Sequence, residues 1–255
     1  MNIEFAGKTV IVTGGAHGFG RAIALNFAER GAYVWTCDIL SEGLQGTKRM
    51  AEGYSGSLRV RTVDITDPDA VKAFCGEARD TDGPIQILVN NAGGVLGQVG
   101  RPLEEITPEQ WSSIFQVNTS GTFYFCQAVA PDMKKAKAGR IVNISSGAGI
   151  KVSLTGIQAY ASAKAAQIGL SRQLAHELGP FGITVNNIAP GFVLSNPTTQ
   201  KQWESYGEQG QKELVNRIAL KRLGSPDDIA HAVMFFASDY AGWITGQIIS
   251  VSGGI

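Results

Sequence analysis

The chain has 255 residues, of which 44% are hydrophobic, and its 22 basic residues are balanced by 22 acidic ones. This length allows one α/β domain that buries roughly three quarters of the surface its unfolded chain would expose. The balanced charge, with no basic run longer than Lys134-Lys135, excludes the electrostatic footprint of a nucleic-acid-binding protein. No apolar run approaches the ~20 residues of a membrane span, so no membrane partner is expected.

The first residues and the cysteines indicate the compartment. Segment 1–7 contains an acid and no apolar core, so we expect no signal peptide. Cys37, Cys75 and Cys126 are isolated, odd in number and without ligand spacing, which predicts free thiols and no metal site. Both features are typical of a cytoplasmic protein.

Apolar strand candidates alternate with helical segments along the whole chain. They lie at 8–13, 33–37, 58–63, 85–89, 140–144, 183–188 and 247–251. This alternation, without a linker, predicts a single α/β domain over 1–255: a Rossmann-type, doubly wound parallel sheet of about seven strands, flanked by helices. Ligands of such sheets bind beyond the carboxyl ends of the strands.

One polar region, 195–222, interrupts the rhythm. We expect it to form short helices that act as a lid over the substrate, with Trp203 and Tyr206 as candidate substrate contacts. A further helix is expected to begin after Ser225, because serine is a good cap, Pro226 fits the first position and acids follow in the first turn.

A glycine-rich loop, 14–20, follows the first strand and leads into a helical segment, 21–30. In this setting backbone approaches a pyrophosphate, and the N-terminus of the helix binds it. The second strand ends at Asp38, where a carboxylate would bind the ribose hydroxyls of an adenosine and repel the 2′-phosphate of NADP. Neither His17 in the loop nor Ile39 after Asp38 is basic, so the sequence predicts NAD as the cofactor.

Tyr160 is the only one of six tyrosines that has a lysine, Lys164, four residues later. On a helix this spacing places both side chains on one face. A lysine ammonium beside a phenol lowers the pKa of the phenol, and such a tyrosine can take a proton from an alcohol or return one to a ketone. The serine pair Ser145-Ser146 lies just upstream.

Taken together, these motifs resemble those of the short-chain dehydrogenase/reductase superfamily, in the compact branch whose chains have about this length. The resemblance covers residues 5–254. It rests on an ordered set of motifs: 13–20, Asp64, 90–93, Asn118, Ser146, Tyr160/Lys164 and Pro190-Gly191. It implies an oxidoreductase with a nicotinamide cofactor, and a homotetramer.

The resemblance also implies four catalytic residues. Asn118 would hold a water in a proton relay, and Ser146 would hydrogen-bond the substrate oxygen. Tyr160 would be the general acid/base, while Lys164 would bind the nicotinamide ribose and lower the pKa of the tyrosine. The serine lies one residue farther from the tyrosine than in many relatives, so Ser145 remains an alternative.

Further matched positions are implied to bind the cofactor. Asp64 would bond the adenine amino group, Asn91 to Gly93 would line the cofactor with backbone, and Val193 would reach the carboxamide. The whole set is Gly14, His17, Gly18, Phe19, Gly20, Asp38, Ile39, Asp64, Ile65, Asn91, Ala92, Gly93, Tyr160, Lys164, Pro190, Gly191, Val193 and Ser195.

The sequence therefore predicts an NAD-dependent oxidoreductase that transfers a hydride between nicotinamide and a secondary alcohol or ketone. Its pocket is expected from segments 94–100, 147–158 and 195–222, with Lys151 and Arg101 as the nearby positive charges. The apolar residues expected there are Val95, Leu96, Ile150, Val152 and Leu154. This composition favours a small cyclic alcohol, sugar or polyol as the substrate.

Three alternatives remain. The first is an NADPH-dependent reductase of 3-oxoacyl thioesters of acyl carrier protein; Asp38 and His17 disfavour it, as does the stretch 179–181, which lacks a basic residue to dock an acidic carrier. The second is a non-catalytic NAD-sensing protein, which would have no need of Tyr160. The third is an epimerase or dehydratase of nucleotide sugars, but such relatives have a longer chain, a T-G-x-x-G-x-x-G loop and a C-terminal substrate domain, which this chain lacks.

Overall fold

The computed structural model describes residues 3–153 and 155–254. These residues form one seven-stranded sheet, in which all neighbouring strands are parallel and the order is β3-β2-β1-β4-β5-β6-β7. The strands are β1 (Thr9–Thr13), β2 (Tyr33–Asp38), β3 (Ser57–Thr62), β4 (Ile85–Asn90), β5 (Gly139–Ile144), β6 (Ile183–Pro190) and β7 (Ile248–Val251). The predicted fold class is confirmed, and each strand begins and ends within two residues of its expected bounds.

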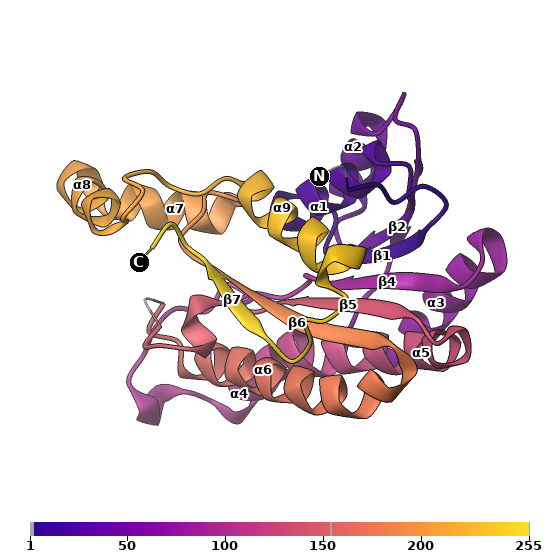
Figure 1. Ribbon diagram of the computed structural model, residues 1–255. Helices are drawn as coiled ribbons and strands as arrows, with labels where there is room; N and C mark the ends of the chain where they lie inside the picture. The colour runs from indigo at the N-terminus through magenta and orange to yellow at the C-terminus, as the bar shows by residue number, and fades with distance from the viewer. Residues whose placement is uncertain (1–2, 154, 255) are drawn as a thin grey trace.

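Helices cover both faces of this sheet. They are α1 (Gly18–Glu29), α2 (Ser41–Met50), α3 (Pro68–Asp82), α4 (Pro108–Phe115), α5 (Gly121–Ala136), α6 (Gln158–Leu178), α7 (Pro197–Ser205), α8 (Gly207–Arg217) and α9 (Pro226–Ala237). Figure 1 shows α1, α2 and α9 on one face of the sheet and α3 to α6 on the other. A π-helical turn, Gln116–Ser120, joins α4 to α5. Short 3-10 turns occur at Leu103–Glu105, Gly147–Gly149, Gly179–Phe181 and Asp239–Ala241.

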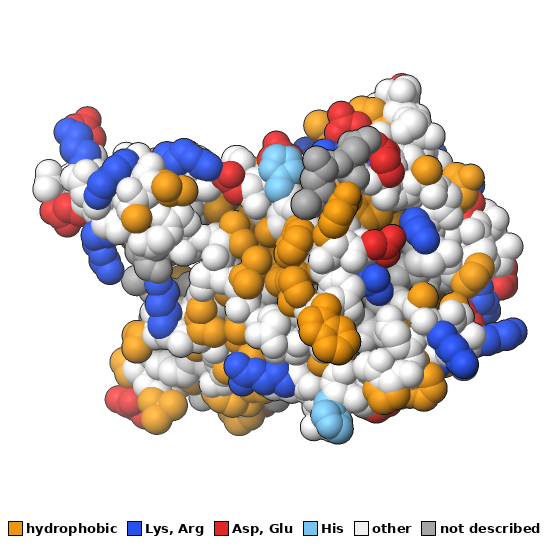
Figure 2. All heavy atoms as spheres, viewed as in Figure 1, with side chains coloured by type: hydrophobic (Ala, Val, Ile, Leu, Met, Phe, Trp, Pro, Cys, Tyr) orange, Lys and Arg blue, Asp and Glu red, His pale blue; other side chains and the backbone are white. Residues whose placement is uncertain are grey.

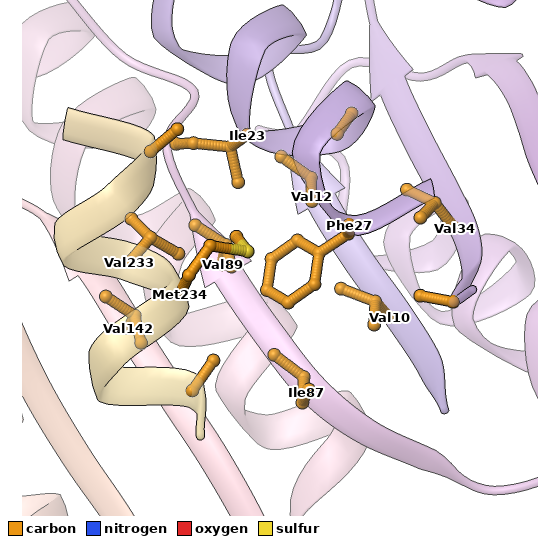
Figure 3. Packing of buried hydrophobic residues seen from close by; sticks show 14 of the residues in the cluster. Val10, Val12, Ile23, Phe27, Val34, Ile87, Val89, Val142, Val233 and Met234 are labelled. Atoms are coloured by element: carbon orange, nitrogen blue, oxygen red, sulfur yellow. The ribbon is translucent and has the colours of Figure 1, made fainter. Parts of the chain in front are cut away.

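Phe27 lies at the centre of the core on the α1 side of the sheet (Figure 3). Val10 and Val12 of β1 contact this core from the sheet, and Val233 and Met234 contribute from α9. Because helices cover both faces, the central strands β1, β4, β5 and β6 are buried on both sides, whereas the edge strand β3 alternates polar with apolar residues. This packing holds the N-terminus of α1 over the carboxyl end of β1.

Local hydrogen bonds fix both ends of the polar region between β6 and α9. At the start of α7, the Asn196 side chain accepts from the backbone N–H of Thr199 at 2.9 Å. At the start of α9, Ser225 Oγ accepts from the N–H of Asp228 at 3.2 Å, and the Asp228 carboxylate accepts from the N–H of Ser225 at 2.7 Å. The predicted start of α9 is thus confirmed, and the expected short helices are α7 and α8. Among the described residues, no helix has the length and apolar character to cross a membrane.

Candidate active site

The carboxyl ends of the central strands open into a cleft of about 930 Å³, next to a second cavity of about 610 Å³. All the predicted cofactor-binding residues except Gly20 line the cleft. Ser146 and Tyr160 line both the cleft and the second cavity. Their hydroxyl groups therefore lie where a cofactor and a substrate would meet.

Gly20 shapes the glycine loop and does not line the cleft, so its predicted contact with the cofactor stays a prediction. A Cβ atom at this position would lie 1.9 Å from the carbonyl oxygen of Gly14 and 2.6 Å from Asn91 Nδ2. Only glycine allows α1 to approach the loop this closely. Its missing side chain is a packing requirement.

Thr13 and Asn91 tie the glycine loop to the loop after β4. The Thr13 hydroxyl accepts hydrogen bonds from the backbone N–H groups of Asn91 at 3.0 Å and Ala92 at 2.9 Å. Asn91 Nδ2 donates to the carbonyl oxygen of Thr13 at 2.9 Å. Gly14, at φ +75°, turns the chain here. Among the described residues, no side chain caps the N-terminus of α1. The backbone N–H groups at the start of α1 therefore suit the pyrophosphate of a dinucleotide.

Two carboxylates, those of Asp38 and Asp64, also line the cleft. Asp38 at the end of β2 accepts from the N–H groups of Ala16 and Leu40, both at 3.1 Å. Asp64 accepts from the backbone N–H and the hydroxyl of Thr66, both at 2.8 Å. Lys164 is the only Lys or Arg lining the cleft within the described part of the chain. The residues present fit the adenosine half of NAD and offer no cation to a 2′-phosphate.

Lys164 and Tyr160 come from the first turns of α6. Lys164 is buried, its Nζ atom donates to the carbonyl oxygen of Ile144 at 2.9 Å, and Nζ lies 5.9 Å from the centre of the Tyr160 ring. Ser146 follows β5, on the same side of the sheet. The three predicted catalytic side chains are therefore brought together around the junction of the two cavities.

Burial dominates the proton affinities of this pair. It lowers the pKa of Lys164 to about 8. It raises the pKa of the Tyr160 phenol, while the hydrogen bond with Ser146 lowers it. The expected net lowering of the tyrosine pKa is not found in the chain alone, because desolvation of the phenol outweighs the hydrogen bond with Ser146. The contribution of Lys164, whose ammonium donates to Ile144, stays a prediction.

The structure separates the two adjacent serines. Ser145 is buried, and its hydroxyl donates to the carbonyl oxygen of Lys164 at 3.1 Å, which joins β5 to α6. Ser146 accepts from the N–H of Ala148 at 3.1 Å and faces both cavities. Of the two, Ser146 is the one placed to contact a substrate in the second cavity.

Asn118 lies behind the site in the π-helical turn and lines neither cavity. Its Nδ2 atom donates to the carbonyl oxygens of Gly94 at 2.8 Å and Ile114 at 2.9 Å. Its Oδ1 atom accepts from the N–H of Gly94 at 2.9 Å. The side chain thus positions the loop after β4, and its predicted role in holding a relay water stays a prediction.

The second cavity differs in part from the expected substrate pocket. Trp203 and Tyr206 do not line it: their ring centres lie 6.0 and 5.9 Å from that of Phe192. Phe192, which the sequence analysis missed, lines both cavities and directly follows the Pro190-Gly191 motif. The aromatic residues of the expected lid therefore support Phe192, which itself faces the cavities.

The charged lining of this cavity also differs from the prediction. Arg101 borders a separate cavity of about 150 Å³, whereas Arg217 at the end of α8 lines the second cavity together with the expected Lys151. Of the expected apolar residues, Val95, Leu96 and Val152 line it; Ile150 does not, and Leu154 lies outside the described residues.

Several residues of the cleft were not predicted. They are Leu40, Val63, Thr66, Ser113, Gln116, Val117, Tyr124 and Ile144. Leu40 and Val63 adjoin predicted residues, so strand-end proximity could have found them. Gln116 and Val117 reach the cleft from the π-helical turn, which no sequence pattern predicted. Gly94, Leu96, Asn196 and Thr199 line the cleft as well, although they were expected in the substrate pocket. Among the described residues, no three His, Cys, Asp or Glu side chains come together as a metal site would require.

Comparison with known proteins agrees with this geometry. The family profile described as Enoyl-(Acyl carrier protein) reductase matches residues 14–255. The chain belongs to the short-chain dehydrogenase/reductase family. It is therefore an oxidoreductase of a family that binds a nicotinamide cofactor.

Three of the similar proteins align over nearly the whole chain. A 3-oxoacyl-[acyl-carrier-protein] reductase of Thermotoga maritima is 37% identical over 100% of this chain and 99% of its own. A (2S)-[(R)-hydroxy(phenyl)methyl]succinyl-CoA dehydrogenase subunit of Thauera aromatica is 38% identical over 97% and 96%. The structure of a 3-oxoacyl-[acyl-carrier protein] reductase with bound NAD from Brucella melitensis is 34% identical, with a TM-score of 0.88, covering 100% of this chain and 93% of that one.

Proposed function

We propose that the protein is an NAD(H)-dependent oxidoreductase that interconverts a 3-hydroxyacyl thioester and a 3-oxoacyl thioester. The observation that carries this proposal is the junction of the two cavities at Ser146 and Tyr160. The names of the relatives from Thermotoga, Thauera and Brucella all specify acyl thioesters. They favour this substrate class over the small cyclic alcohol, sugar or polyol expected from the sequence.

The residues suit reduction of a ketone at neutral pH. Because burial raises the pKa of Tyr160, its phenol keeps the proton that it donates to the substrate oxygen. Ser146 donates a hydrogen bond to the same oxygen and stabilises its developing charge. Lys164, whose pKa is about 8, is largely protonated at pH 7 and stabilises the phenolate that forms. NAD(H), when bound, supplies or accepts the hydride.

The preference for NAD(H) follows from Asp38. Its carboxylate is held by the N–H groups of Ala16 and Leu40, so it cannot swing away from the ribose site without losing two hydrogen bonds. A 2′-phosphate at that site would meet a fixed negative charge and no compensating Arg or Lys from the described residues. Among thioester reductases, we therefore favour one that uses the non-phosphorylated cofactor.

The thioester is better assigned to a small carrier such as coenzyme A than to a carrier protein. Near Phe181, the Lys134 ammonium lies 5.2 Å from the centre of the Phe181 ring and is in an ion pair with Glu177 at 2.9 Å. An acidic protein would have to compete with Glu177 for this charge.

A steady-state assay tests the proposal. Oxidation of NADH and of NADPH is followed at equal concentrations with acetoacetyl-CoA, and with a panel of cyclic ketones and ketosugars, using Tyr160→Phe as the inactive control. Turnover of the thioester with NADH is the expected result. Activity only on cyclic ketones or sugars would overturn the substrate class, and activity only with NADPH would overturn the cofactor.

We also propose that the protein self-associates as a homotetramer. Trp243 is fully exposed, and Tyr240 before it in the chain and Ile249 in the edge strand β7 are exposed as well. Figure 2 shows hydrophobic side chains gathered over α9 and β7. Trp111 and Phe123 form a second exposed apolar site on α4 and α5. Two self-complementary faces generate a tetramer with dihedral symmetry. Light scattering should give four chains, and Trp243→Ser should reduce the assembly to dimers.

A further inference from the structure

The second cavity has an unbalanced charge. Lys151 and Arg217 are its only Lys or Arg lining residues, and no Asp or Glu lines it in the described part of the chain. The other polar lining side chains are the imidazole of His17 and hydroxyls and amides such as those of Ser153, Thr198 and Gln202. A cavity with two cations and no anion of its own is suited to a ligand that carries negative charge.

Lys151 lies close to the proposed reaction centre. Its backbone N–H donates to the carbonyl oxygen of Gly147 at 3.0 Å, so the chain turns back immediately after Ser146. A Cβ atom built on Gly147 would lie 3.7 Å from the Cε atom of Lys151. The lysine side chain therefore runs alongside the residue that follows the serine, and its charge acts on the inner part of the cavity.

Arg217 brings charge from a separate element. It is the last residue of α8, a helix that also carries Glu208, Lys212 and Glu213, all exposed and none of them lining the cavity. Arg217 forms no hydrogen bond or ion pair with the rest of residues 3–153 and 155–254. The helix dipole favours a cation at a C-terminal end. The helix dipole does not explain why the Arg217 side chain faces the cavity.

We propose that Arg217 and Lys151 bind an anionic group of the substrate, a carboxylate or a phosphate, that lies away from the reacting carbon. The inference rests on the proposed function in that it takes the second cavity as the substrate site. A guanidinium matches the two oxygens of a carboxylate or phosphate, and a lysine acts as a point charge on either. The anion is bound equally in ground state and transition state, so its loss raises KM and leaves kcat.

Three substrates separate the two sources of the anion. The N-acetylcysteamine thioester of acetoacetate is neutral, acetoacetyl-CoA adds phosphates, and the N-acetylcysteamine thioester of 3-oxoadipate adds a carboxylate. Arg217→Gln should raise KM about tenfold or more for at least one charged substrate, with kcat and the neutral substrate little changed. The charged substrate whose KM rises shows whether the bound anion is a phosphate or a carboxylate. The matched control is Lys212→Gln, which removes an exposed cation from the same helix.

An equal effect of Arg217→Gln on all three substrates, or no effect on any, would overturn the proposal. If no thioester is reduced, the proposed substrate class is wrong. Direct binding of anions then tests the proposed role of Arg217 and Lys151. Calorimetric titration of the NADH-saturated protein with adipate and with pyrophosphate should show binding that weakens about tenfold in Arg217→Gln and is unchanged in Lys212→Gln. Absence of binding by both probes would also overturn it.

Discussion

Asn118 holds the backbone of Gly94 at two points, through Nδ2 to the carbonyl oxygen at 2.8 Å and through Oδ1 to the N–H at 2.9 Å. Gly94 lines both cavities, whereas Asn118 lines neither. The asparagine thus acts on the site from behind, by fixing the loop that forms the wall between cofactor and substrate. Its amide has little capacity left for any other ligand, because Nδ2 also donates to Ile114.

Replacing Asn118 by leucine should therefore impair both stability and activity. The change leaves the buried polar groups of Gly94 and Ile114 without partners, at a cost of about 2–4 kcal/mol in the free energy of unfolding. With the loop released, KM for NADH should rise at least about tenfold. Urea denaturation and steady-state kinetics measure the two effects. Ser112→Ala, an exposed change on the preceding helix, is the control. Wild-type KM in the leucine variant would contradict the positioning role.

The pH dependence of ketone reduction follows from Tyr160 and Lys164. Reduction needs a protonated phenol and a charged ammonium, and Lys164 loses its proton around pH 8. We expect kcat/KM for reduction to be level near pH 7 and to fall through an apparent pKa near 8, which belongs to the coupled pair. Oxidation of the alcohol, which needs a phenolate, should increase only at higher pH, because burial raises the pKa of Tyr160 above its ordinary value. A reduction rate that stays level up to pH 10 would contradict this account.

The burial of Lys164 also makes stability depend on pH. Its pKa falls from an ordinary value of 10.5 to about 8 on folding, so the unfolded chain binds this proton more tightly. The resulting cost is fully present below pH 8 and disappears as the pH rises from 8 to 10.5. Lys164→Met should therefore be more stable than the wild type at pH 7, by about 1–3 kcal/mol after the lost bond to Ile144 is counted.

Urea midpoints of the wild type and Lys164→Met at pH 7 and pH 10 measure this effect. The difference between the two urea midpoints should be smaller at pH 10 than at pH 7. Turnover should be lost in Lys164→Met at both pH values. A difference that is the same at both pH values would show that the lysine is not desolvated as the structure implies.

The positions of the strands and most of the cofactor cleft were predictable because they depend on short-range signals. A buried strand followed by glycines or a polar residue, such as Gly14 after β1 or Asp38 at the end of β2, indicates both an element and its functional end. The choice between Ser145 and Ser146 needed the structure. It depends on which of the two hydroxyls donates to the backbone of α6, and that hydroxyl is the one of Ser145.

Other features depend on contacts between segments far apart in the chain. No local pattern shows that Trp203 and Tyr206 pack on Phe192, or that Arg217 faces the second cavity while Arg101 does not. The proton affinity of Tyr160 was misjudged for a related reason. Helical spacing places Lys164 near the phenol, but burial and the hydrogen bond to Ile144 decide how the two groups interact.

Gly20→Ala should disrupt the glycine loop. The new methyl group would lie 1.9 Å from the carbonyl oxygen of Gly14, so backbone must move. We expect a loss of at least about 2 kcal/mol in the free energy of unfolding and a large loss of NADH affinity. Gly76→Ala on α3 is the matched control, because its methyl group meets only the end of the Arg79 side chain at 3.6 Å. That change should stabilise the helix by about 0.5–1 kcal/mol. Equal NADH affinity in the two variants would contradict the packing role of Gly20.

Asp38→Asn tests the charge at the ribose site without changing its shape. The amide oxygen can still accept from the N–H of Ala16 or Leu40, but the negative charge that opposes a 2′-phosphate is gone. The ratio of kcat/KM for NADH to that for NADPH should fall at least about tenfold, chiefly because NADPH improves. Asp64→Asn, in the same cleft, should weaken both cofactors alike and leave the ratio unchanged. If the ratio moves equally in both variants, discrimination belongs to the overall charge of the cleft, and Asp38 has no special part in it.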